Sequence, residues 1–255
     1  MFFPISDDDR HLLKPAWVTI ALVVANALVF WIQQGDPDFT LGWSVVPAEI
    51  TGGVDLRDPV RVISGGEVIE LPQAPGPWPI YLTLLSSMFM HGGWGHIGGN
   101  MLYLWIFGDN VEHRFGPLRF LVFYVLSGLA ASAVQIGMNP DGLIPNLGAS
   151  GAISGVMGAY MVMFPRNRVN AIFLVRMVSV PAVVVLGAWI VMQLVSGAGT
   201  IGGPQHAGGV AYGAHIGGFV AGVVAGVVAR LGMKKEPPTV FRDIYERQPR
   251  VRKYW

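Results

Sequence analysis

The sequence contains no cysteine and few charged residues. Without Cys among the 255 residues, disulfide bonds, thiolate catalysis and cysteine-ligated metal sites are excluded. Charged residues make up 13% of the chain and hydrophobic residues 52%, whereas about a quarter of a soluble domain is usually charged. This balance predicts that much of the chain is surrounded by lipid. The 34 glycines fit that environment, because small residues let membrane helices approach closely.

The chain also lacks the basic start of a cleavable signal peptide. Apolar residues and Pro4 are followed by three aspartates at 7–9, so we interpret the first apolar stretch as a retained helix. With short ends and no targeting peptide, a bacterial plasma membrane is the expected location.

Six apolar stretches are candidates for membrane-spanning helices. Such a helix needs about 20 mostly apolar residues. The candidates are about 16–33, 95–108, 117–138, 149–164, 172–195 and 209–230. The second stretch contains His and Asn, and polar residues inside a span are costly enough to indicate function. We therefore predict an all-α fold, a polytopic membrane bundle of six transmembrane helices.

The basic residues predict the orientation of this bundle. If the six spans are right, all of the 17 Lys and Arg residues except Arg57 and Arg61 lie on one side. Because Lys and Arg mark the cytoplasmic side, both termini are expected to be cytoplasmic. The chain then divides into a cytoplasmic segment 1–15, a membrane domain 16–231 and a basic cytoplasmic tail 232–255.

The long loop 34–94 within the membrane domain would be exoplasmic. Its tryptophans and prolines suit a segment that lies against or partly in the membrane interface, and loops of this length are usually functional. We expect short helices there rather than a separate domain. The basic tail is interpreted as a solvated end held near anionic lipid.

A serine stands at the exoplasmic start of the fourth span, in Gly148-Ala149-Ser150-Gly151. Backbone N–H groups at a helix N-terminus lack partners and favour negative charge. Ser150 is therefore a candidate nucleophile with oxyanion donors beside it. Taken alone, the motif fits an ordinary N-cap serine among packing glycines better.

A histidine in the sixth span, His215, is a candidate general base for such a serine. Small residues repeat every four positions in both spans: Gly151, Gly155 and Ala159 in span four, and Gly218, Gly222 and Gly226 in span six. These two series would let the helices that carry Ser150 and His215 pack closely.

The second span begins with a third polar cluster. His96 and Asn100 are four residues apart and share one helix face, where an imidazole and an amide N–H can stabilise an oxyanion. A metal site of His91, His96 and His215 is the rival reading, but no carboxylate is placed to join it. Spans two, four and six all enter from the exoplasmic side, so the three clusters are expected to converge at one depth. Transporters and channels usually carry ionisable residues near the midplane and internal repeats, which this sequence lacks.

With these motifs the chain resembles the rhomboid intramembrane serine proteases over nearly all its length. The resemblance rests on His91 with His96-x-x-x-Asn100, on Gly148-Ala149-Ser150-Gly151, and on Ala214-His215-x-x-Gly218-x-x-x-Gly222. The sequence Gly108-Asp109-Asn110-Val111-Glu112 and the order of spans also match. Two positions depart from the family: neither Trp43 nor Trp78 is followed by Arg, and Ser154 replaces a Tyr that packs on the histidine in some relatives.

The resemblance implies a Ser150–His215 dyad without a catalytic Asp, which cleaves single-pass transmembrane proteins near their outer end. His96, Asn100 and the Ser150 backbone would hold the oxyanion, with His91 in support. It also implies that span five opens laterally for substrate. No cofactor, metal or nucleic acid is expected, membrane lipid is the surrounding partner, and the oligomeric state is left open. A client-binding relative without catalysis would share the fold but should lack Ser or His.

Overall fold

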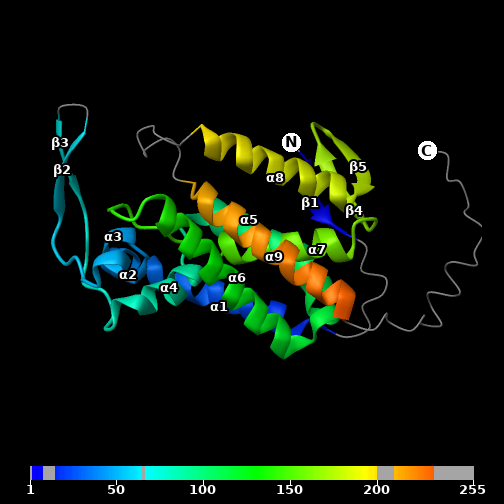
Figure 1. Cartoon of the computed structure of the whole chain (residues 1–255), viewed down its shortest axis with the longest axis horizontal. Coiled ribbons are helices and arrows are strands. Elements are labelled where there is room, and N and C mark those ends of the chain that lie inside the picture. Colours follow the sequence, from blue (N-terminus) through cyan, green and yellow to red (C-terminus); the bar gives the residue numbers. More distant parts are fainter. Residues whose placement is uncertain (1, 8–14, 65–66, 200–209, 233–255) are drawn as a thin grey trace, which may run out of the picture.

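The computed structural model describes residues 2–7, 15–64, 67–199 and 210–232, and Figure 1 shows their arrangement. The helices are α1 (Trp17–Gln33), α2 (Pro37–Trp43), α3 (Pro47–Gly52), η1 (Ile80–Leu82), α4 (Thr83–Ser86), η2 (Ser87–Phe89), α5 (Trp94–Phe115), α6 (Pro117–Met138), α7 (Ser150–Met163), α8 (Ala182–Ala198) and α9 (Tyr212–Gly232). The strands are β1 (Phe2–Ser6), β2 (Val60–Ser64), β3 (Glu67–Leu71), β4 (Arg168–Phe173) and β5 (Arg176–Pro181).

Helix α7 forms the centre of the bundle. Every residue from 151 to 160 is buried, and α5, α6, α8 and α9 all pack against it. Helix α8 lies at the edge of the bundle, beside α9 and the β4–β5 hairpin (Figure 1). The first residue of the central helix, Ser150, therefore sits among helices from distant parts of the chain.

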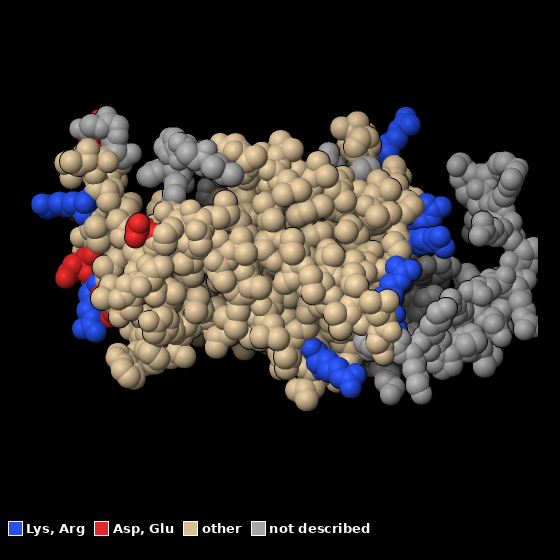
Figure 2. Space-filling view, in the orientation of Figure 1, with Lys and Arg blue, Asp and Glu red and all other residues tan. Residues whose placement is uncertain are grey.

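The described helices suit a membrane environment. Helices α6 and α9 are long and apolar enough to cross a membrane by length and composition, and α1, α7 and α8 are shorter apolar helices. On the face drawn in Figure 2, the Lys, Arg, Asp and Glu side chains of the described residues gather at the two ends and leave a wide uncharged middle. An uncharged band on this face suits contact with the hydrocarbon core of a bilayer.

Helix α5 continues seven residues beyond the predicted end at 108. This extra segment contains Glu112, a buried carboxylate that has hydrogen-bond partners at the start of α1. Glu112 accepts hydrogen bonds from the backbone N–H groups of Val18 (3.0 Å) and Thr19 (2.7 Å), and from the Thr19 hydroxyl (2.9 Å). The N-cap residue Ala16 offers no side-chain acceptor. Glu112 thus caps α1 and places negative charge at its N-terminus, where the helix dipole favours it.

The prediction of an all-α chain is wrong in two regions, a three-stranded sheet and a hairpin in the first loop, and the limits of span five are wrong as well. The sheet has the order β1-β4-β5 and is antiparallel throughout, so the helix begins only at Ala182 instead of 172. The apolar run 172–181 is rich in β-branched residues, which favour strands. Leu174, with a φ of 57°, lies in the turn between β4 and β5, and Pro181 ends β5 and precedes α8.

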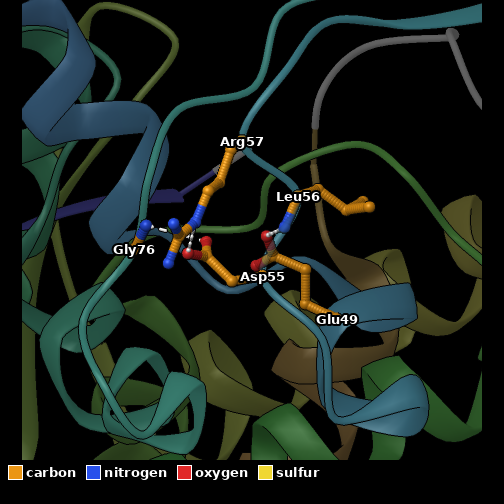
Figure 3. A network of polar contacts seen from close by, with 5 residues as sticks. All are labelled: Glu49, Asp55, Leu56, Arg57 and Gly76. Atoms are coloured by element: carbon orange, nitrogen blue, oxygen red, sulfur yellow. Dashed lines mark hydrogen bonds and ion pairs between the residues drawn. The ribbon is translucent and has the colours of Figure 1, made fainter.

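The loop 34–94 contains the short helices α2, α3, η1, α4 and η2, together with a β2–β3 hairpin that the sequence did not predict. Figure 3 shows the polar contacts that organise it. Glu49 accepts from the Leu56 N–H at 2.8 Å, and Asp55 accepts from the Gly76 N–H at 2.8 Å and pairs with Arg57. Burial raises the pKa of Glu49 above its ordinary value.

This loop also holds the segment that precedes Ser150. Val45 and Asn146 exchange two backbone hydrogen bonds of 3.0 and 2.8 Å, and the Gly148 N–H donates to the Ser87 carbonyl at 2.8 Å. Gln73 donates to the Leu143 carbonyl at 2.8 Å. The first loop therefore fixes where α7 begins.

Candidate active site

Ser150 is the first residue of α7, and the chain directly before it passes very close to the side chain of His96. Gly148 has a φ of 133°, and a Cβ there would lie 2.9 Å from His96 Nε2, so the position requires glycine. Ala149 is fully buried and caps the helix without a side-chain hydrogen bond. The first N–H groups of α7 consequently lack helical partners and lie beside the Ser150 hydroxyl.

His215 lies in the first turn of α9, and its Nε2 is 2.9 Å from Ser150 Oγ. The two residues are 65 positions apart in the sequence, so only the packing of α7 on α9 brings them together. On the other side of the imidazole, Nδ1 is 2.8 Å from Gln193 Oε1 of α8. A hydroxyl within hydrogen-bond reach of an oriented imidazole is the arrangement of an activated nucleophile.

The glycines of α7 and α9 meet in register. A Cβ at Gly218 would lie 1.9 Å from the Gly151 carbonyl oxygen, and one at Gly222 would lie 1.9 Å from the Gly155 carbonyl oxygen. A Cβ at Gly226 would come within 3.0 Å of Ala159. The two backbones are therefore in direct contact, and the contact begins one residue after Ser150 and three residues after His215.

His96 presents a donor to the region of Ser150. Its Nδ1 accepts a hydrogen bond from the Gly92 N–H at 3.2 Å, which leaves the proton on Nε2. A Cβ built on Gly148 would lie 2.9 Å from this Nε2 and 3.5 Å from Ser150 Oγ, so the two groups are close together. An imidazole N–H so near to a nucleophile can stabilise an oxyanion.

Asn100 and His91 occupy supporting positions. Asn100 is 8% exposed, lies one turn deeper on α5 than His96, and its Nδ2 has no hydrogen-bond partner among the described residues. The His91 ring packs edge-on against His96, at 5.1 Å between centroids. The backbone N–H of His91 donates to Gln33 Oε1 of α1 at 2.9 Å. In the described part of the chain, Ser150 Oγ has its side-chain hydrogen bond with His215 and not with Asn100 or His91.

A three-histidine metal site is not assembled in the described residues. Both ring nitrogens of His215 already face Ser150 and Gln193. In the parts of the chain that the structure describes, no group of three His, Asp or Glu side chains is placed to hold a metal ion.

A cavity of about 40 Å³ adjoins Ser150. Its polar lining includes Ser132 and Gln135 of α6 and Asn146 of the loop before α7. A water molecule needs roughly 10–15 Å³ of such volume. The cavity therefore has room for a few waters or a small side chain beside the hydroxyl.

Sequence reasoning missed two residues of this site, both on α8. Gln193 Oε1 faces His215 Nδ1, and the Trp189 ring lies 5.7 Å from the His215 ring, at an interplanar angle of 40°. Trp189 thus packs on the histidine, whereas Ser154 donates to the Ser150 carbonyl at 2.6 Å. A glutamine in an otherwise apolar span was a usable signal, because buried polar groups in membranes require partners.

Comparison with known proteins gives a consistent family. The Rhomboid domain profile matches residues 79–231. The chain is 32% identical over 149 residues to "Rhomboid protease GluP" of Bacillus subtilis, which is 56% of this chain and 27% of that protein. It is 31% identical to "RHOMBOID-like protein 12, mitochondrial" of Arabidopsis thaliana, over 52% of this chain and 44% of the relative.

A third relative, "Rhomboid protein 1, mitochondrial" of Saccharomyces cerevisiae, is 30% identical over 53% of this chain and 38% of its own length. The chain thus spans less than half the length of each of these three relatives. The matched region extends from the end of the first loop through α9 and contains Ser150, His215, His96 and Asn100. The chain is therefore a membrane protein that belongs to the rhomboid family.

Proposed function

We propose that the protein is an intramembrane serine endopeptidase that hydrolyses peptide bonds in or near transmembrane segments of membrane proteins. The observation that carries this proposal is the 2.9 Å contact between Ser150 Oγ and His215 Nε2, which is partly buried at the start of α7. Two of the similar proteins are named as a rhomboid protease and a rhomboid protein.

The residues fit an acyl-enzyme mechanism. His215 Nε2 takes the Ser150 hydroxyl proton as Oγ bonds to the scissile carbonyl carbon, and the carbonyl electron pair moves to its oxygen. His96 Nε2–H, Asn100 Nδ2 and the N–H groups at the start of α7 are the donors for that oxyanion. The imidazolium then gives its proton to the leaving amide nitrogen as the C–N bond breaks.

Water completes the cycle from the exoplasmic side. Its proton passes to His215 while its oxygen attacks the ester carbon, and the proton returns to Ser150 Oγ as the ester bond breaks. The cavity beside Ser150, whose lining includes the polar side chains of Ser132 and Gln135, can hold such water or a small substrate side chain. The reaction needs no metal or cofactor, because the imidazole carries every proton.

The proposed topology follows the charge pattern. Six spans, formed by α1 and α5 to α9, would divide the chain into a segment 1–15, a membrane domain 16–231 and a tail 232–255. Most of this tail lies outside the described residues. Both termini would be cytoplasmic, with Ser150 near the exoplasmic side of a bacterial plasma membrane. The substrates would be single-pass proteins that enter from the lipid beside α8, the helix at the edge of the bundle.

The test is cleavage of a single-pass transmembrane substrate by purified protein in detergent and in liposomes. Wild type should cut, whereas Ser150→Ala and His215→Ala should both lose cutting while keeping the melting temperature of wild type. Ser196→Ala, which changes a hydroxyl on α8 outside the dyad, is the matched control and should retain activity. An inert wild type that binds the substrate would favour a client-binding protein instead.

A further inference from the structure

The second nitrogen of the His215 ring has a defined partner. Gln193 Oε1 is 2.8 Å from Nδ1, and the Gln193 side chain is buried, with 5% of its surface exposed. Nothing in the family motifs of α7 and α9 includes this residue, which belongs to α8. The imidazole is therefore held between a hydroxyl from one helix and an amide from another.

The chemistry of the amide decides which ring nitrogen carries the proton. A carbonyl oxygen only accepts hydrogen bonds, so Nδ1 must be the donor in this pair. A neutral imidazole has one N–H, and Nε2 is consequently left with its lone pair facing the Ser150 hydroxyl. The opposite tautomer, with the proton on Nε2, could not accept the proton of Ser150.

A ring contact from the same helix reinforces this orientation. Trp189 lies one helical turn before Gln193 on α8, and its ring packs both on His215 and on Phe219, at centroid distances of 5.7 and 6.0 Å. Phe219 is one turn after His215 on α9. Trp189 thus supports the orientation of the imidazole ring, and Gln193 determines which ring nitrogen carries the proton.

We infer that Gln193 is a positioning residue that holds His215 in the tautomer with Nε2 free to act as a base, in place of the missing catalytic Asp. This inference rests on the proposed Ser150–His215 mechanism. Because Gln193 and Trp189 both belong to α8, the dyad is poised only while α8 is seated against α9. Displacement of α8 removes the acceptor and the ring contact together.

The experiment compares two substitutions at one position. Gln193→Leu keeps the volume and removes the acceptor, whereas Gln193→Glu keeps an acceptor oxygen whether or not its carboxyl is ionised. Val191→Leu is the control, because Val191 is a residue of α8 with 57% of its surface exposed. Each variant is assayed for kcat and KM on a model single-pass transmembrane substrate and for its melting temperature. Nitrogen-15 NMR of histidine-labelled protein reports the His215 tautomer.

The Leu variant should lose about 10- to 100-fold in kcat, a part of the roughly 100- to 10,000-fold that a positioned general base contributes, with little change in KM. Gln193→Glu should recover most of that loss, and Val191→Leu should match wild type. In wild type the His215 proton should be on Nδ1, and the Leu variant should show a tautomer mixture. A wild-type proton on Nε2, or an unchanged kcat in the Leu variant, would overturn the inference. A purely structural Gln193 would lower the melting temperature of both variants and leave kcat intact.

The two proposals fail in different ways. If wild type cuts and depends on Ser150 but Gln193→Leu cuts equally well, only the role of Gln193 is lost. If wild type cuts nothing, the protease proposal is lost, while the NMR measurement still determines the tautomer because it requires no turnover.

Discussion

Replacing Gly218 by alanine should separate the two halves of the dyad. The added Cβ would lie 1.9 Å from the Gly151 carbonyl oxygen, whereas ordinary van der Waals contact starts at 3.4 Å. The obstacle is backbone rather than a flexible side chain, so α7 and α9 must move apart by about 1.5 Å. Gly218 is three residues from His215 and Gly151 adjoins Ser150, so the displacement acts directly on their 2.9 Å contact.

The structure sets the scale of both effects. Forcing extra volume into a packed contact costs about 1–3 kcal/mol of stability. A displacement of the reacting groups by roughly 1 Å can lower the rate by about 100-fold. We therefore expect Gly218→Ala to fold, to melt at a lower temperature, and to cleave a transmembrane substrate about 100 times more slowly than wild type.

Two further alanine variants make the comparison specific. Gly187→Ala, on α8, meets no atom within 4 Å and should behave as wild type. Gly226→Ala touches the same helix contact at its far end, where the Cβ comes within 3.0 Å of Ala159, and should lower stability more than activity. Substrate cleavage rates and melting temperatures in detergent are the measurements. The reasoning is refuted if Gly218→Ala cleaves at the wild-type rate, or if Gly226→Ala loses as much activity.

Two more predictions concern the first loop and α8. Burial raises the pKa of Glu49, so the folded protein binds its proton more tightly than the unfolded chain. Stability should therefore fall as the pH rises from about 4.5 through the higher folded value. In Glu49→Gln this fall should be smaller, as melting temperatures across that pH range would reveal; identical curves would contradict the assignment. A Cβ at Gly197 would lie 3.1 Å from Tyr212 Cβ, near the spacing of a disulfide. In this cysteine-free chain, oxidised Gly197→Cys/Tyr212→Cys should lose cleavage of transmembrane substrates until reduced, yet still react with a small fluorophosphonate. Full cleavage in the oxidised state would show that α8 need not leave α9.

The parts of the site that lie in one helix each were readable from the sequence. Intramembrane polar residues stand out against apolar spans, so Ser150, His215 and His96 became candidates because of their cost in lipid. The four-residue glycine spacing predicted which helix faces could touch, and the structure places Gly218 against Gly151 and Gly222 against Gly155.

The parts that depend on tertiary contacts were not readable. An apolar run such as 172–181 has the composition of a span, and only the antiparallel pairing of β5 with β4, and of β4 with β1, makes this region a sheet. The sequence placed Glu112 beyond the end of the second span, and it did not show that this carboxylate caps α1 from inside the fold. The sequence did not show that Gln193 is the hydrogen-bond partner of His215, because this contact depends on how α8 packs beside α9.

The central claim is that Ser150 is a nucleophile activated by His215. The most direct measurement is reaction of the purified protein with a fluorophosphonate, followed by mass spectrometry of its peptides. The account predicts a single phosphonylated residue, Ser150, with labelling abolished in Ser150→Ala and strongly reduced in folded His215→Ala. An adduct on another residue, or labelling of Ser150 that is as fast in His215→Ala as in wild type, would contradict it.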